Sequence, residues 1–140
     1  MSELKNFSSL FTLPNKIALI TGGSRGIGLH TATGLLLAGC STVIITARRA
    51  SGKDGIDQAM TKLNALPGIT GKAVGIAANC ADKEDIERLA KWVKERYGKL
   101  DILVANAGAS WGSSFEEAPD EASRKILDLN VRGIFHLAQK

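Results

Sequence analysis

The stretch ITGGSRGIG, residues 20–28, places four glycines within nine residues, directly after the apolar run KIALI at residues 16–20. Glycine at this density weakens both helices and strands. A glycine-rich turn between a strand and a helix has a specific use, because it lets backbone N–H groups at the start of the helix approach an anion without an intervening side chain. The surrounding sequence therefore has to supply a strand before this stretch and a helix after it.

Predicted strands and helices alternate along the chain. Short apolar or β-branched runs predict strands at residues 16–21, 41–47, 72–78 and 100–106. Helical periodicity with terminal glycine or proline predicts helices at residues 27–39, 54–66, 82–98 and 119–139. This alternation predicts an α/β fold, a Rossmann-like parallel sheet flanked by helices, here with about four strands in the order 3-2-1-4.

The segment DKEDIERLAKWVKERYG, residues 82–98, carries the clearest helical pattern in the chain. Asp82 is a capping residue with Asp85 three positions later, and Gly98 ends the helix. One face of this helix is apolar, which predicts that it packs against the sheet. That face consists of Ile86, Leu89, Val93 and Tyr97.

Composition narrows the class of protein. The chain has 140 residues, the size of one domain, and 44% of them are hydrophobic, which is enough for a core. No apolar run reaches the roughly 20 residues of a membrane span, and residues 1–16 lack the apolar segment of a signal peptide. We therefore predict a cytoplasmic protein with no membrane interaction. Cys40 and Cys80 predict two buried free thiols, with no disulfide and no metal site.

The positive charge of the chain is unevenly distributed. The net charge is +4, and the whole excess lies in residues 1–70, the half that contains the glycine-rich stretch. Such a charge would attract an anionic ligand to that half. The alternative is that so small an excess arose by chance. Nucleic acid is disfavoured as a partner, because the chain has no basic run with interleaved aromatic side chains.

The glycine turn suits a pyrophosphate, although the interval from Gly22 to Gly26 is longer than in the common dinucleotide fingerprint. Gly22 would open the turn, Gly26 would allow close approach of the phosphates, and Gly28 would let the helix pack on the strand. A second predicted strand ends about 20 residues further on, as in dinucleotide-binding units. The alternative is a purely structural turn, but the strand before it and the helix after it favour dinucleotide binding.

Three motifs follow one another at the ends of predicted strands or within the last helix: TGGSRGIG (21–28), VANAG (104–108) and DLNVRG (128–133). With them, the sequence from about Asn15 onward resembles the short-chain dehydrogenase/reductase family. Within that family it is loosely similar to 3-oxoacyl-carrier-protein reductases. The resemblance implies that the cofactor pyrophosphate is held by Gly22, Ser24, Gly26, Ile27 and Gly28.

The resemblance also gives roles to three asparagines. Asn106 would steady the sheet beside the cofactor ribose, with Ala107 and Gly108 leaving room for it. Asn79 stands where the family usually has an Asp that faces the adenine ring, so the side chain keeps an acceptor and gains a donor. Asn130 matches the family's active-site Asn, which orders a proton-relay water. Each Asn could instead be a local cap or turn, although Asn is unfavourable in the middle of a helix.

Arginines rather than an acid follow the second predicted strand. An NAD site would need Asp or Glu there to accept the ribose 2′-hydroxyl, and residues 43–53 contain neither. Arg48 and Arg49 follow Ala47, and Arg25 lies in the glycine-rich stretch. Because arginine suits a 2′-phosphate, we predict NADP as the cofactor. Arg48 is the first candidate to bind the phosphate and Arg25 the second, whereas Arg49 could equally be a solvated surface charge.

The catalytic pair of the family, a Tyr with a Lys four residues later, has no match in these 140 residues. The single tyrosine, Tyr97, is followed four residues later by Asp101. The resemblance implies that residues 1–140 form one NADP-binding domain, the N-terminal portion of a longer reductase that acts on a small-molecule carbonyl or alcohol. We expect no carbonyl reduction by this stretch alone. The alternative is a non-catalytic nucleotide-binding or interaction protein that is complete at 140 residues.

Apolar side chains near the end of the sequence predict self-association. The fourth predicted strand would present an unpaired edge, which recruits other chains. The last predicted helix would leave apolar side chains for a partner. These are Ile126, Leu127, Ile134, Phe135 and Leu137. We therefore predict a homo-oligomer, aggregation, or dependence on the rest of a longer chain.

Overall fold

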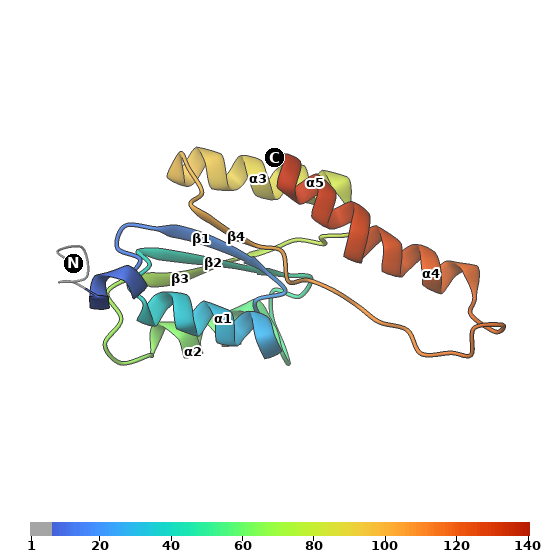
Figure 1. Cartoon of the computed structure of the whole chain (residues 1–140), viewed down its shortest axis with the longest axis horizontal. Coiled ribbons are helices and arrows are strands. Elements are labelled where there is room, and N and C mark those ends of the chain that lie inside the picture. Colours follow the sequence, from blue (N-terminus) through green and yellow to red (C-terminus); the bar gives the residue numbers. More distant parts are fainter. Residues whose placement is uncertain (1–6) are drawn as a thin grey trace.

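Four parallel strands form one sheet in the centre of the computed structural model, which describes residues 7–140 (Figure 1). β1 (Ile17–Thr21) pairs with β2 (Thr42–Ala47) on one side and with β4 (Ile102–Val104) on the other. β2 also pairs with β3 (Lys72–Ala77). The order β3-β2-β1-β4 confirms the predicted α/β, Rossmann-like fold and its strand order.

Helices cover both faces of the sheet (Figure 1). α1 (Gly26–Leu37) and α2 (Ile56–Asn64) lie on one face, and α3 (Lys83–Tyr97) and α5 (Ile134–Gln139) lie on the other. A short 3-10 helix, η1 (Phe7–Phe11), precedes β1 and was not predicted from the sequence. This arrangement explains why β1 is apolar from Ile17 to Ile20, since a strand covered on both faces has no solvent side.

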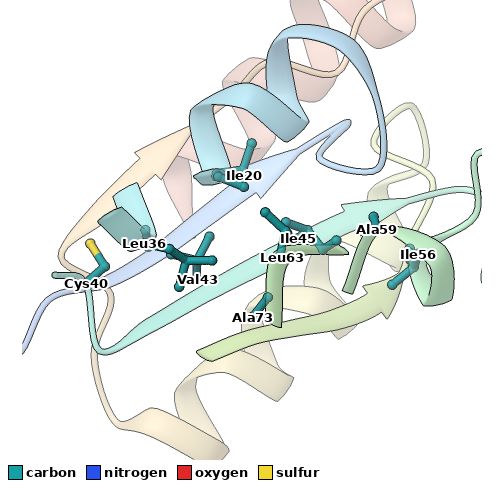
Figure 2. Close-up of a cluster of buried hydrophobic side chains, with 11 residues drawn as sticks. Ile20, Leu36, Cys40, Val43, Ile45, Ile56, Ala59, Leu63 and Ala73 are labelled. Carbon is teal, nitrogen blue, oxygen red and sulfur yellow. The ribbon is translucent and has the colours of Figure 1, made fainter. Parts of the chain in front are cut away.

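Alternate residues of β1 enter two different cores. Ala18 and Ile20 belong to the cluster under α1 and α2, part of which is shown in Figure 2. Ile17 and Leu19 belong to the cluster under α3 and α5. All five β1 residues are buried. The sheet is therefore fixed from both sides, and the loops at its carboxyl edge rest on a packed base.

The structure confirms the capped amphipathic helix at α3. The Asp82 carboxylate accepts a hydrogen bond from the Asp85 backbone N–H at 2.9 Å, and Gly98 ends the helix in the left-handed region at φ 72°. The predicted inner face of α3 is buried at its first three positions. Tyr97, the fourth, is partly buried and packs edge-to-face on Trp92 with 5.8 Å between ring centroids.

Two predicted elements are clearly longer than the observed ones, whereas the other boundaries differ by only one or two residues. β4 covers three residues instead of the predicted 100–106, because the chain turns at both ends. At its start, the Asp101 carboxylate accepts from the Ile17 N–H at 2.9 Å, and at its end the Asn106 N–H bonds back to the Val104 carbonyl at 3.0 Å. α2 begins at Ile56 rather than at residue 54, because Asp54 has a positive φ of 61° and cannot continue a right-handed helix.

The predicted long helix at 119–139 is helical from Asp120 onward but is not uniform. α4 (Asp120–Leu127) passes into a π-helical stretch, η2 (Asp128–Gly133), which continues into α5 (Figure 1). A Cβ on Gly133 would lie 2.0 Å from the Cys80 carbonyl oxygen, so this backbone touches the loop after β3. The wider π turn is thus located where the helix backbone contacts the loop after β3.

The packing of α5 corrects one prediction about exposed surface. Leu137 was predicted to be free for a partner, but it is buried in the core cluster under α3. Leu127, Ile134 and Phe135 are exposed, as predicted. Ile126 is half-buried. Leu137 turns inward because α5 lies against α3, a long-range contact that the sequence pattern did not reveal.

Both cysteines are buried and free, as predicted from the sequence. Burial raises the pKa of Cys80 to about 11, partly offset by a hydrogen bond with Thr21. Cys80 is therefore a neutral thiol at physiological pH and behaves as a small apolar residue of the loop after β3.

Two glycines of α1 provide a matched test of how closely this helix packs on the glycine turn. A Cβ on Gly28 would lie 2.3 Å from the Gly22 carbonyl oxygen, whereas a Cβ on the exposed Gly34 would meet nothing within 4 Å. We expect Gly28→Ala to lower the free energy of unfolding by about 1–3 kcal/mol, the usual effect of overpacking. Gly34→Ala should raise it by about 0.5–1 kcal/mol through helix propensity. Urea unfolding measures both, and equal changes of the same sign would contradict the close approach.

Candidate cofactor site

A pocket of about 430 Å³ opens at the carboxyl ends of the strands. Each strand contributes the residues that follow it: Gly22 after β1, Arg48 after β2, Asn79 after β3 and Asn106 after β4. Ligands of open α/β sheets bind at this edge, where the loops from neighbouring strands diverge. The pocket thus lies where ligands usually bind in folds of this class.

The glycine turn forms the floor of the pocket. Gly22 and Gly26 have positive φ values of 66° and 53°, a conformation that side chains other than glycine rarely adopt. The Gly23 N–H donates to the Thr46 carbonyl at 3.1 Å, which ties the turn to β2. At the N-cap of α1, Arg25 makes no side-chain capping hydrogen bond. The first amides of α1 therefore have no side-chain acceptor from their cap residue, and Gly26 and Ile27 of this turn line the pocket.

Asn106 connects β4 to this turn. Its Nδ2 donates to the Thr21 carbonyl at 2.9 Å and to the Gly22 carbonyl at 3.3 Å. In addition, the Ala107 N–H donates to Thr21 Oγ1 at 2.9 Å. A Cβ on Gly28 would lie only 2.7 Å from Asn106 Nδ2. The amide is therefore enclosed by the turn and α1, and it fixes the distance between two walls of the pocket.

A second network holds Asn79 at the end of β3. The Asn79 N–H donates to Asp85 Oδ2 at 2.7 Å, and Asn79 Oδ1 accepts from the Ala81 N–H at 3.2 Å. Arg88 donates to the other Asp85 oxygen at 2.7 Å and to the Ala77 carbonyl at 3.0 Å. These contacts leave the Asn79 amide nitrogen as the donor available at the pocket. Hydrogen bonds from Arg88 and the Asn79 N–H hold the pKa of Asp85 below its usual range.

Asn130 lies beside the pocket in η2 and contacts its wall. The Ala109 N–H donates to Asn130 Oδ1 at 3.0 Å, and Asn130 Nδ2 donates to the Ala109 carbonyl at 2.8 Å. This reciprocal pair engages both polar atoms of the side chain, and each atom keeps a second hydrogen-bonding position. It holds the segment that leaves β4 against the π-helical stretch, which explains how an Asn is accommodated within a helix.

The rim of the pocket carries three arginines and one acid. Arg25, Arg48, Arg49 and Asp54 all contribute to the lining. Asp54 Oδ2 lies 3.8 Å from Arg25 Nη1. Asp54 was not predicted as a site residue, because it lies several residues beyond the end of β2. The dipeptide Asp54-Gly55 is a turn signal that could have drawn attention to this position.

The structure brings most of the predicted cofactor-binding residues to one pocket. Those that line it are Gly22, Ser24, Arg25, Gly26, Ile27, Arg48, Asn79, Asn106, Ala107 and Gly108. Gly28 is buried beneath the turn, and Asn130 reaches the pocket through Ala109, which lines it. Residues that the sequence analysis did not single out also contribute, among them Ala78, Cys80 and Leu129.

Two features are absent from residues 7–140, the part of the chain that the structure describes. Within this range no helix is long and apolar enough to cross a membrane. In the same range, no three His, Cys, Asp or Glu side chains are grouped so that they could hold a metal ion.

The chain belongs to the short-chain dehydrogenase family. The family profile described as short chain dehydrogenase matches residues 16–140, which includes every element of the sheet. This assignment agrees with the resemblance carried by the glycine turn, by residues 104–108 and by residues 128–133.

Relatives of known sequence support the family assignment. The chain is 41% identical over 130 residues to the rhamnolipids biosynthesis 3-oxoacyl-[acyl-carrier-protein] reductase of Pseudomonas aeruginosa, covering 93% of this chain and 48% of that protein. It is 35% identical over 127 residues to the 3alpha-hydroxysteroid dehydrogenase of Mediterraneibacter gnavus, covering 91% of this chain and 49% of the relative. The chain thus spans about half the length of these relatives.

Solved structures share the fold. The Pseudomonas aeruginosa RhlG/NADP active-site complex superposes with a TM-score of 0.81 at 41% identity, covering 92% of this chain and 47% of that one. L-Sorbose reductase from Gluconobacter frateurii, complexed with NADPH and L-sorbose, also has a TM-score of 0.81, at 29% identity, over 92% of this chain and 47% of the reductase chain.

The Asp85 network predicts a pH-dependent contribution to stability. Because the folded-state pKa of Asp85 is lowered, its stabilisation is present above the unfolded pKa of about 3.9 and is lost as pH falls through the folded value. We expect Asp85→Asn to be less stable than wild type at pH 7, and the difference to shrink toward pH 3. Urea unfolding at both pH values measures this change.

Glu84→Gln is the matched control for Asp85→Asn. Glu84 also lies in the first turn of α3, so its removal deletes the same charge from the same end of the helix. Its side chain is exposed. Equal losses of stability in the two variants at pH 7 would show that the helix dipole, and not the Asn79 network, accounts for the effect of Asp85.

Proposed function

We propose that residues 1–140 supply the NADP(H)-binding part of a short-chain dehydrogenase that interconverts a small-molecule carbonyl compound and an alcohol. The observation that carries this proposal is that the glycine turn and three arginines line one pocket at the carboxyl edge of the sheet. A glycine turn alone suits any dinucleotide, whereas the added positive charge favours one with a further phosphate.

The phosphate-binding part of the proposal rests on the floor of the pocket. Gly22, Gly26 and the first turn of α1 offer backbone N–H groups and the positive end of a helix dipole to a pyrophosphate. Ser24 and Ile27 line the same pocket. The ribose would lie against Asn106, Ala107 and Gly108, where the lack of bulky side chains leaves room.

The choice of NADP over NAD rests on the end of β2. Arg48 follows Ala47 directly, at the strand end where dinucleotide-binding folds contact the adenosine ribose. An arginine there can make charge-assisted, bidentate contacts to a 2′-phosphate. Two solved relatives were obtained with NADP and with NADPH, which supports the same choice.

The adenine end of the cofactor would lie beyond β2, toward β3. Asn79 is the polar side chain at that end, and its amide nitrogen is the donor available to the pocket. The Ala81 N–H holds the Asn79 side chain and Asp85 holds the Asn79 backbone N–H, so the side chain can select a base by hydrogen bonding at small entropic cost.

Hydride transfer to a carbonyl also needs a proton donor near the substrate oxygen. Tyr97 packs on Trp92 in α3 and does not line the pocket. We therefore propose that these residues bind and orient the cofactor and that the proton donor comes from outside this stretch. In this view Asn130 is a site residue that holds the loop after β4 and, as in the resembled family, orders a proton-relay water.

Titration of NADPH and NADH into the wild-type chain and Arg48→Ala tests the cofactor assignment. Losing a charge-assisted contact costs about 1.5–3 kcal/mol, which corresponds to roughly one to two decades in NADPH affinity. NADH affinity should hardly change. Arg124→Ala, which removes an exposed arginine of α4 outside the pocket, is the control. Unchanged NADPH affinity in Arg48→Ala would refute the proposed role.

We further propose that the chain forms homo-oligomers through the exposed side of the α4–α5 region. Leu127, Val131 and Phe135 are each more than half exposed, at 55%, 56% and 62%, and they follow one another at intervals of four residues. Within the described part of the chain, β4 pairs only with β1, so its other edge is open as well. Apolar surface and a free strand edge both favour association.

Sedimentation velocity at low micromolar concentration tests the oligomer. We expect wild type to sediment above its monomer mass of 14.8 kDa, and Phe135→Ser to shift toward the monomer. Trp111→Ser is the control, because Trp111 is similarly exposed, at 61%, but lies in the segment between β4 and α4. A single folded species of 14.8 kDa in wild type would contradict the proposal.

A further inference from the structure

Asp54 is an acid in a pocket otherwise rimmed by arginines. It lies in the connection between β2 and α2, and it lines the same pocket as Arg25, Arg48 and Arg49. Its carboxylate oxygen Oδ2 is 3.8 Å from Arg25 Nη1. A ligand phosphate drawn to these arginines would therefore meet a negative charge of the protein beside one of them.

The backbone, and not the ion pair, determines where Asp54 lies. Asp54 has a φ of 61°, and a Cβ on the following Gly55 would lie 2.6 Å from the Ser51 carbonyl carbon. Three backbone hydrogen bonds close this loop, each linking N–H and C=O groups at 3.0–3.1 Å: Gly55 to Gly52, Ile56 to Arg49 and Asp57 to Ala50. The carboxylate is thus presented to the pocket by a rigid loop with an unusual conformation.

The contact between Asp54 and Arg25 is loose. The side chains are 46% and 74% exposed, and 3.8 Å exceeds the length of a hydrogen bond. Exposed pairs of this kind contribute little to stability. Arg25 therefore remains free to turn toward another anion, but any such anion has to draw it away from Asp54.

We propose that Asp54 is a specificity-determining residue that weakens the preference for the phosphorylated dinucleotide by competing with its 2′-phosphate for Arg25. The inference rests on the proposed function. A 2′-phosphate can pair with Arg25 only when Arg25 leaves Asp54. The Asp54 carboxylate also repels the phosphate. A dinucleotide without this phosphate meets no such repulsion, and its ribose hydroxyls can donate to a carboxylate. The ratio of NADP to NAD affinity is therefore smaller than it would be with the three arginines alone.

Asp54→Asn is the sharpest test, because Asn tolerates a positive φ as well as Asp does and so removes the charge without changing the loop. We expect it to raise NADPH affinity roughly twofold to fivefold, the range for an exposed charge pair. NADH affinity should stay equal or fall, and the gain for NADPH should diminish at high salt. Asp57→Asn, which removes an equal charge from the first turn of α2 outside the pocket, should change neither affinity.

The same titrations in the Arg25→Ala background test the competition itself. In that background Asp54→Asn should raise NADPH affinity clearly less, because Arg25, for which Asp54 and the phosphate compete, is absent. A gain of equal size in both backgrounds would overturn the competition, as would a loss of NADPH affinity in Asp54→Asn, which would mean that Asp54 positions Arg25 for the phosphate. Urea unfolding of each variant verifies that it is folded.

The failure of this inference differs from the failure of the proposed function. If wild type binds neither NADPH nor NADH, the proposed function is wrong and the inference falls with it. If wild type binds NADPH and the ratio of NADPH to NADH affinity is the same in Asp54→Asn, only the inference is wrong. Titration with 2′,5′-ADP and 5′-ADP gives a second readout restricted to the phosphate, and the same shift in preference is expected there.

Discussion

The close approach of Gly28 to the carbonyl of Gly22 is the constraint on which the site depends. A side chain at residue 28 would occupy the space now filled by the Gly22 oxygen and the Asn106 amide. With glycine there, α1 can begin directly beneath the turn, and Asn106 can bridge the carbonyls of Thr21 and Gly22. The amides of α1, the turn and the end of β4 consequently share one small volume.

Short polar contacts extend this arrangement across the whole edge of the sheet. Gly23 joins the turn to β2, Asp85 holds the loop after β3, and Asn130 holds the segment after β4. All three contacts involve backbone groups, so they fix loops that would otherwise be mobile. A ligand would therefore meet a largely preformed pocket, in which long side chains contribute mainly at the arginine-rich rim.

Much of the site could be predicted from the sequence, because most of its residues directly follow the ends of strands along the chain. Once β1 to β4 were assigned and ordered, the residues after each strand had to meet at one edge, which brought Gly22, Arg48, Asn79 and Asn106 together. Asp54 was missed for a physical reason. It is several residues beyond β2, and only the closed, left-handed conformation of its loop returns it to the pocket.

The sequence by itself determined the parallel sheet, its order and the capped helix α3, because periodicity, glycine turns and Asp82 act over a few neighbouring residues. The tertiary structure alone decided the features that need distant partners. The π-helical stretch arises where Gly133 meets Cys80, and Leu137 is buried because α5 lies on α3. Asp54 faces Arg25 for the same reason: contacts between residues far apart in the chain depend on packing, which a local pattern does not encode.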